Sequence, residues 1–244
     1  MNDDPPDLRR RRFLRDSARW ASAAAATSLL PIALAQPGLH ADQQVLARVR
    51  GGRVRGQREH GMCVFRGLRY GADTAAYRFQ PPRREMPWRG TADALDYGAA
   101  APQGGSEGPG SEDCLFLNVW TPALGDGGKR PILFYIHGGG FNNGSGSDPL
   151  YDGGALCRRG DVVVVTVNHR LNLFGYLYLG ALGDPRMAAS GNVGQLDLVQ
   201  ALQWVREHAA VFGGDAGNIT VFGQSGGGAK IATLMAMPAA KGLF

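Results

Sequence analysis

The stretch that decides the fold reads Ile219-Thr220-Val221-Phe222-Gly223-Gln224-Ser225-Gly226-Gly227. Its β-branched and aromatic residues predict a strand, and the apolar positions Ile231, Leu234 and Met235 beyond the glycines predict a helix. A serine at such a junction occupies a sharp, strained turn, where small neighbours let adjacent backbone pass close beneath it. Its hydroxyl then points out above the sheet, beside helix N–H groups that favour developing negative charge. The stretch therefore predicts a nucleophile, Ser225, on a strand-to-helix turn.

The G-x-S-x-G pattern alone is weak support in a chain with 37 glycines, and it occurs twice. The other copy is Gly104-Gly105-Ser106-Glu107-Gly108, which stands in an irregular Pro/Gly-rich stretch. Without a flanking strand and helix the pattern has no mechanical meaning, so context selects Ser225. The alternative for Ser225 is a glycine-rich turn that only packs a strand against a helix.

A second glycine-rich motif favours the catalytic interpretation. The loop His137-Gly138-Gly139-Gly140-Phe141 directly follows an apolar run and matches the H-G-G-G loop that supplies oxyanion donors in lipases and esterases. Acyl transfer places negative charge on the carbonyl oxygen, and each preorganised N–H donor stabilises that charge by about 3–4 kcal/mol. Taken alone the loop could be flexible, but together with Ser225 in this chain order it indicates acyl-transfer chemistry.

Apolar runs along the chain predict an α/β protein. Residues 131–136 and 162–167 are continuous apolar runs, typical of central parallel strands buried on both faces. Further strands are predicted at residues 62–68 and 115–120, and a hairpin at residues 45–58. We therefore expect a mostly parallel central sheet with flanking helices.

One long helix is predicted between Gly194 and Phe212. Its apolar positions step by four, three, four and three residues and so share one helical face; they are Leu198, Leu202, Val205, Ala209 and Phe212. Gly213-Gly214 ends the pattern. This helix is expected to cover the sheet.

Several further motifs resemble those of the type-B carboxylesterases, the family that also includes the cholinesterases. The likeness covers nearly all of residues 43–244, and its carriers are residues 111–120, residues 160–171, Phe212-Gly213-Gly214-Asp215, Asn218 and the turn at Ser225. The resemblance implies an α/β-hydrolase fold. It also implies hydrolysis of a small-molecule ester through an acyl-enzyme on the serine, with no metal or organic cofactor.

Carried over residue by residue, the resemblance makes Ser225 the nucleophile and the N–H groups of Gly139, Gly140 and Gly226 the oxyanion hole. It also implies a structural ion pair between Arg78 and Glu112. For that pair the alternative is two separately solvated side chains, which charged residues so far apart in sequence more often are.

Three substitutions depart from the family pattern. Ala101 stands where a cysteine often precedes Pro-Gln, so Cys114 is expected to be a buried free thiol. His169 stands where tyrosine is common and is expected to be a hydrogen-bonded core histidine. Gln224 replaces the usual glutamate before the nucleophile, which removes a negative charge and could change the preference for cationic substrates. We expect the chemistry at Ser225 to survive.

The family is much longer than this chain and takes its triad acid and histidine from its second half. We therefore expect residues 36–244 to be the N-terminal part of a hydrolase domain, truncated after the helix that follows Ser225, and to be inactive and poorly folded alone. His137 belongs to the oxyanion loop, and His208 is a poor candidate for the base. Two alternatives stay open: a non-catalytic adhesion or scaffold protein of the same fold, and a truncated gene product that only binds.

The first 35 residues predict a twin-arginine-type signal peptide. Residues 10–15 read Arg-Arg-Arg-Phe-Leu-Arg, an alanine-rich apolar run from Trp20 to Leu34 follows, and Ala33-Leu34-Ala35 fits an A-x-A cleavage site. The alternative is a basic tail before a short helix. Because Pro31 breaks the short apolar run, stable membrane insertion is not expected. We expect the twin-arginine translocase as a partner and a periplasmic or secreted mature protein.

Composition argues against other functional classes. The 244 residues are 44% hydrophobic, enough for a sizeable core. The net charge of +5 falls to +3 beyond residue 35, because residues 1–35 carry six arginines and four acids. No basic block could follow a phosphate backbone, so no nucleic-acid partner is expected. Three cysteines without metal-ligand spacing and five scattered histidines argue against a metal site.

Overall fold

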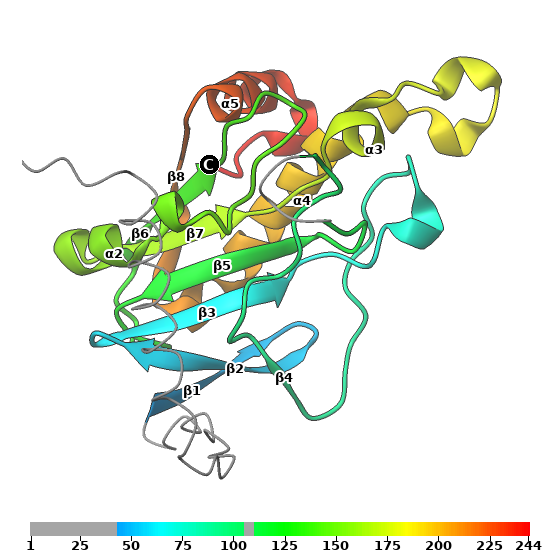
Figure 1. The fold of residues 1–244 in the computed structure, drawn as a ribbon. Helices are drawn as coiled ribbons and strands as arrows, with labels where there is room; N and C mark the ends of the chain where they lie inside the picture. Colours follow the sequence, from blue (N-terminus) through cyan, green and yellow to red (C-terminus); the bar gives the residue numbers. More distant parts are fainter. Residues whose placement is uncertain (1–42, 105–109) are drawn as a thin grey trace, which may run out of the picture. The chain divides into compact units, whose positions relative to one another are not determined.

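The computed structural model describes residues 43–104 and 110–244, so the predicted signal peptide and Ser106 lie outside the described residues. An eight-stranded sheet forms the centre of the described part (Figure 1). Its strands are β1 (Gln44–Val49), β2 (Gly52–Glu59), β3 (Met62–Arg69), β4 (Thr91–Asp93), β5 (Phe116–Thr121), β6 (Arg130–Ile136), β7 (Val163–Val167) and β8 (Gly214–Gly223). The helices are α2 (Gly154–Gly160), α3 (Asn172–Tyr176), α4 (Val193–His208) and α5 (Gly226–Ala236). Single 3-10 turns lie at Ala75–Tyr77, Pro149–Tyr151, Gly180–Leu182, Pro185–Met187, Ser190–Asn192, Ala209–Phe212 and Pro238–Ala240.

The strands lie in the order β1-β2-β3-β5-β7-β6-β8, with β4 beside β2. Neighbours from β1 to β7 pair antiparallel, whereas β7, β6 and β8 run parallel. Tight turns join β1 to β2 and β2 to β3, which forces antiparallel pairing, while crossovers through α2 and α4 permit parallel pairing. The predicted α/β class and hairpin are confirmed, but the described sheet is more mixed than the sequence predicts.

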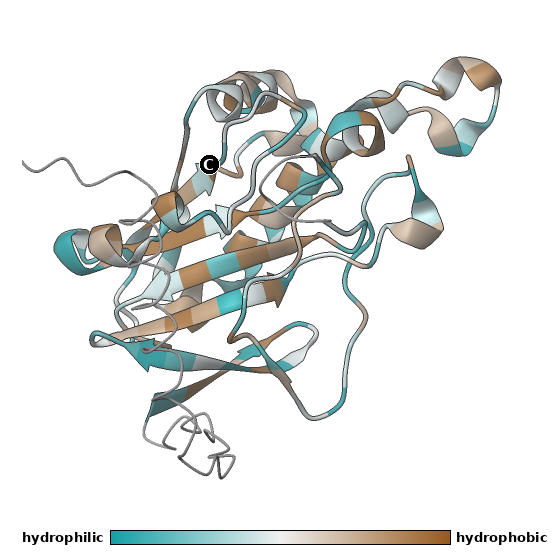
Figure 2. Cartoon of the chain, viewed as in Figure 1, coloured by the Kyte–Doolittle hydropathy of each residue, from teal (hydrophilic) through white to brown (hydrophobic). Residues whose placement is uncertain are grey.

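Helices cover both faces of the central strands. All five residues of β7 are buried, and its four valines are divided between two hydrophobic clusters on opposite faces of the sheet. Val163, Val165 and Val167 pack in the cluster that includes residues of α4, while Val164 packs with Cys157 of α2. Figure 1 draws α4 behind the sheet, and Figure 2 shows the apolar colouring of β5, β6 and β7. The prediction of a central strand buried on both faces is confirmed.

Helix α4 ends at His208, four residues before the end of the predicted helical pattern at Phe212. The five predicted apolar positions are nevertheless all buried, three on α4 and two in the turn that follows it: Leu198, Leu202, Val205, Ala209 and Phe212. After His208 the chain tightens into a 3-10 turn, and Gly213 follows in the left-handed region with φ 69°. The N–H of Gly213 donates to the carbonyl of Ala210 at 3.2 Å, which closes the turn before β8.

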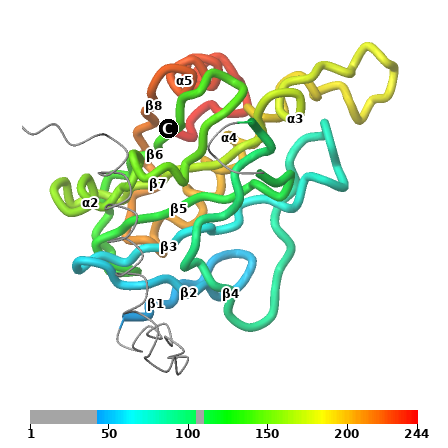
Figure 3. The backbone as a smooth tube through the Cα atoms, in the orientation of Figure 1, coloured from blue at the N-terminus to red at the C-terminus, as the bar shows by residue number. Residues whose placement is uncertain are grey.

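The helix predicted after Ser225 is confirmed as α5, whereas the expectation for β8 is wrong in detail. The sequence pattern indicates a buried strand, but Ile219 is buried while Thr220 is exposed, because β6 is the one described strand that pairs with β8. On α5, Leu234 enters the core as expected, whereas Met235 is 76% exposed. Figure 3 follows the chain from β8 into α5, beside the end of β6.

None of the helices within residues 43–104 and 110–244 has the length and apolar character that crossing a membrane requires.

Candidate active site

Ser225 sits on a strained turn between β8 and α5. Its backbone angles, φ 52° and ψ −117°, fall in a region that residues with a Cβ atom rarely adopt. The N–H of Gly227 donates to the carbonyl of Gln224 at 2.9 Å and closes the turn. Ser225 itself is exposed. The turn therefore has the strained, outward-facing geometry that the sequence predicts.

Glycine is required on both sides of this turn by the end of β6. A Cβ atom on Gly227 would overlap the carbonyl oxygen of Ile136, and a Cβ on Gly223 would lie 2.6 Å from the same oxygen. Real Cβ atoms do not approach backbone so closely, so larger residues here would push α5 and β8 away from β6.

The triple-glycine loop lies directly against the turn. Gly139 and Gly140 have φ values of 80° and 61°, in the left-handed region that favours glycine. A Cβ atom on Gly226 would overlap the carbonyl oxygen of Gly140, and one on Gly138 would overlap the side-chain oxygen of Gln224. The segments 137–141 and 223–227, which are 82 or more residues apart in the chain, are thus in backbone contact, as the two predicted motifs require.

The three predicted donors have amides without backbone partners. Within the described residues, the N–H groups of Gly139 and Gly140 donate no backbone hydrogen bond. Gly226 is the first residue of α5, so its N–H has no acceptor within the helix. The helix N-terminus adds a partial positive charge. This arrangement can accept an anionic oxygen beside Ser225.

No described side chain forms a hydrogen bond with the Ser225 hydroxyl. In particular, none of the described histidines does so. His60 lies in the turn between β2 and β3. His208 ends α4, and its Nε2 accepts from the N–H of Arg50 at 2.8 Å. His137 and His169 are buried. His40 lies outside the described residues.

Two buried histidines stack on each other, one of them at the start of the triple-glycine loop. The rings of His137 and His169 lie 4.9 Å apart and nearly parallel. Each Nδ1 is 2.9 Å from the carbonyl oxygen of the next residue in the chain. Burial lowers the pKa of His137 to about 4 and that of His169 well below its usual value, and the nearby Lys230 lowers both further. The rings are therefore neutral, and the expectation of a hydrogen-bonded core histidine at His169 is confirmed.

Lys230 was missed by sequence reasoning. It lies on α5 and is fully buried, with its Nζ 3.4 Å from the carbonyl oxygen of His137. Burial lowers the pKa of Lys230 to about 8. The available signal was a lysine five positions after the serine, next to the apolar residues of a helix, where a buried face would have to accommodate it.

A buried ion pair anchors the segment after β7. The guanidinium of Arg170 donates to both carboxylate oxygens of Asp197 on α4, at 2.9 and 2.7 Å. Both side chains are at most 2% exposed. The backbone N–H of Arg170 also donates to Asp197, at 3.0 Å. The pair therefore fixes His169, one residue earlier, relative to α4.

Two smaller expectations from the resemblance are also confirmed. Arg78 Nε donates to Glu112 at 2.6 Å, so the predicted ion pair exists, although the Arg78 side chain is 55% exposed. Cys114 is a buried free thiol, as are Cys63 and Cys157. Within the described residues no group of three or more His, Cys, Asp or Glu side chains is arranged to hold a metal ion.

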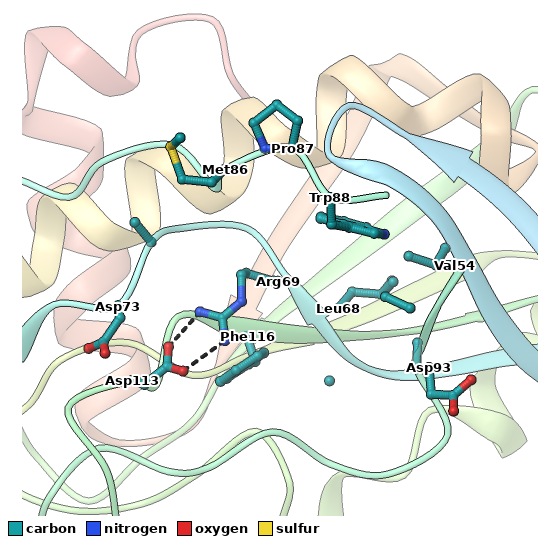
Figure 4. Close-up of a pocket in the computed structure, with 14 residues that line it drawn as sticks. Val54, Leu68, Arg69, Asp73, Met86, Pro87, Trp88, Asp93, Asp113 and Phe116 are labelled. Atoms are coloured by element: carbon teal, nitrogen blue, oxygen red, sulfur yellow. Dashed lines mark hydrogen bonds and ion pairs between the residues drawn. The ribbon is translucent and has the colours of Figure 1, made fainter. Parts of the chain in front are cut away.

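Two cavities lie on different parts of the described structure, and one of them shares a residue with the triple-glycine loop. A cavity of about 590 Å³ lies over β2, β3 and β4, between Trp88 and the ion pair of Arg69 with Asp113 (Figure 4). Neither Ser225 nor the triple-glycine loop lines it, so it is separate from the candidate active site. A hollow of about 290 Å³ shares Phe141 with the loop and is lined further by Asn142, Asn172, Leu173, Tyr176 and Leu177.

The chain belongs to the carboxylesterase family, whose pattern it matches over residues 41–244. It is 45% identical over 202 residues to the para-nitrobenzyl esterase of Bacillus subtilis (strain 168), and 42% identical over 211 residues to the phenmedipham hydrolase of Pseudarthrobacter oxydans. Those matches cover 79% and 82% of this chain. The crystal structure of the Geobacillus stearothermophilus carboxylesterase EST55 superimposes with a TM-score of 0.79 at 48% identity, over 82% of this chain.

These comparisons confirm the expected family and the α/β-hydrolase fold. The chain spans about two fifths of the length of these relatives, which is 40% of the para-nitrobenzyl esterase and 41% of both the phenmedipham hydrolase and EST55.

Proposed function

We propose that the protein containing this chain hydrolyses small-molecule carboxylic esters, with Ser225 as nucleophile and the N–H groups of Gly139, Gly140 and Gly226 as oxyanion hole. The observation that carries the proposal is the contact between the exposed, strained turn at Ser225 and the triple-glycine loop. Membership of the carboxylesterase family and the named activities of the relatives support ester hydrolysis.

The reaction follows from this placement of groups. The Ser225 oxygen attacks the carbonyl carbon of the ester while a base takes the hydroxyl proton. The three amides stabilise the negative charge that develops on the carbonyl oxygen. The carbon–oxygen bond to the alcohol then breaks, the alcohol leaves with the proton, and an acyl group remains on Ser225. Water attacks this acyl-enzyme in the same way and releases the acid.

The base and its acidic partner are proposed to lie outside the described residues. No described histidine contacts Ser225, and the chain spans two fifths of the relatives' length. We accordingly expect residues 36–244 alone to be inactive, whereas a polypeptide that also supplies the histidine and acid hydrolyses esters.

The test is turnover of p-nitrophenyl acetate by the full-length gene product and by residues 36–244. We expect turnover by the former only. Ser225→Ala should lower kcat by at least about 10³-fold, because the covalent route is lost. Ser106→Ala, in the other G-x-S-x-G copy, is the matched control and should retain activity. Retained turnover in Ser225→Ala would contradict the proposal and leave a non-catalytic role for this site.

Export through the twin-arginine translocase is a separate proposal, supported by Arg10-Arg11-Arg12-Phe13-Leu14-Arg15 and the cleavage pattern at residues 33–35. Replacing Arg10, Arg11 and Arg12 with lysine should leave the full-length protein in the cytoplasm. A protein that still reaches the periplasm or medium would contradict this route.

A further inference from the structure

One ammonium group contacts both ends of the triple-glycine loop. Lys230 Nζ donates to the carbonyl oxygen of His137, which immediately precedes the glycines, at 3.4 Å. The same Nζ lies 5.5 Å from the ring centroid of Phe141, which immediately follows them, within range of a cation–π interaction. The glycines between these contacts carry the proposed oxyanion donors Gly139 and Gly140.

Lys230 is poorly placed to stabilise the fold. It is fully buried, and no described carboxylate lies within 4.0 Å of it, so its positive charge has no counter-ion there. An unpaired buried charge costs free energy, so the position is not explained by packing alone.

We propose that Lys230 is a positioning residue for the oxyanion hole: its ammonium holds the triple-glycine loop against the Ser225 turn, and its positive charge lowers the energy of the anionic transition state. This inference rests on the proposed function. The charge lies behind the loop and need not touch substrate, so its effect should fall on the chemical step and not on binding of the neutral ester.

The proposal has a pH dependence that follows from the groups facing Lys230. His137, after β6, and His169, after β7, both face it and are neutral above mildly acidic pH. Arg170 beyond them stays charged and is paired with Asp197. Of this cluster Lys230 alone titrates at mildly alkaline pH, with a pKa of about 8. Loss of its proton should therefore lower kcat as pH rises above about 8.

The experiment compares Lys230→Met, Lys230→Arg and the exposed control Lys241→Met in the full-length gene product. We expect Lys230→Met to lower kcat at least tenfold at pH 7 with KM changed less than twofold, and to weaken binding of a trifluoromethyl ketone transition-state analogue by a similar factor. Lys230→Arg keeps the charge and should retain more activity, without the fall in kcat above pH 8. Lys241→Met should match the wild type.

Stability separates positioning from a structural role. A structural lysine predicts that Lys230→Met lowers the thermal midpoint together with kcat, which would overturn the proposal, whereas a positioning lysine predicts an equal or higher midpoint. A folded Lys230→Met variant with the kcat of the wild type would also overturn the proposal. The proposed function would stand in that case, because turnover would still depend on Ser225. Should Lys230→Met not fold, the pH profiles of the wild type and Lys230→Arg decide, and identical profiles overturn it. Turnover that survives Ser225→Ala would instead refute the proposed function itself.

Discussion

The backbones of Gly226 and Gly140 are in direct contact: a Cβ atom on Gly226 would overlap the carbonyl oxygen of Gly140. The two residues belong to segments that follow neighbouring parallel strands, β8 and β6. Because the carboxyl ends of parallel strands meet at one edge of a sheet, residues after both strands converge there. This convergence places the exposed Ser225 beside amides that have no backbone partner.

Two adjacent glycines of α5 should respond in opposite ways to alanine. A Cβ on Gly227 overlaps the carbonyl oxygen of Ile136, whereas a Cβ on Gly228 meets nothing within 4 Å. We expect Gly227→Ala to lower the free energy of unfolding by about 1–3 kcal/mol, the range of overpacked sites, and to abolish activity. Gly228→Ala should leave activity intact and raise stability by up to about 1 kcal/mol through helix propensity. Urea denaturation measures both, and equal losses in the two variants would contradict the contact.

The ion pair of Arg170 with Asp197 should matter far more than an exposed pair. Asp197→Asn leaves the buried guanidinium without its counter-charge, so we expect a loss of about 3–5 kcal/mol in the free energy of unfolding. The control is Asp184→Asn, because the partner Arg186 is 70% exposed and solvent screens that pair. Its loss should be far smaller than that of Asp197→Asn. Similar midpoints for the two variants would refute the assignment of Arg170 as an anchor.

The cost of burying Lys230 should depend on pH. The pKa of Lys230 is about 8 in the folded protein, against a usual value of 10.5. Between those values the unfolded chain binds more protons, so the free energy of unfolding rises with pH, and the full cost applies below pH 8. We therefore expect Lys230→Met to be more stable than wild type at pH 7, with the difference shrinking toward pH 10. A constant difference across this range, measured by urea denaturation, would show that Lys230 does not titrate there.

The three thiols should be unreactive in the folded protein. Cys63, Cys114 and Cys157 are buried, and burial raises the pKa of Cys157 to about 11 and that of Cys114 further. Because the thiolate is the reactive form, Ellman's reagent at pH 8 should titrate no cysteine natively and all three after unfolding. Rapid native reaction of one thiol would show that its surroundings open.

Sequence patterns predicted those strands and helices whose burial leaves a continuous or periodic run of apolar residues. Residues 131–136 and 162–167 are strands because continuous apolar runs fit a strand covered on both faces. The three-residue strand β4 was missed, since its pairing with β2 depends on residues about 38 positions away and leaves no periodic signal. Met235 is exposed although it belongs to the apolar pattern of the predicted helix, because periodicity cannot tell which flank of a helix a neighbour covers.

The candidate site was predictable where a motif fixes backbone conformation. Gly223, Gly226 and Gly227 around Ser225, and residues 138 and 139, stand where a Cβ atom would overlap a neighbour. Gly140 is favoured by its left-handed φ of 61°. Lys230 could not be predicted in this way, because its role depends on a tertiary contact with His137, 93 residues away. A lysine on a helix is ordinarily solvated, so only burial distinguishes this one.

Labelling by a fluorophosphonate probe tests the central claim most directly. The full-length gene product is treated with the probe and digested, and the modified peptide is identified by mass spectrometry. The account predicts one phosphonylated residue, Ser225, and no labelling in Ser225→Ala or in the denatured protein. Labelling of Ser106 or another serine, or no labelling of a folded protein that hydrolyses esters, would contradict it.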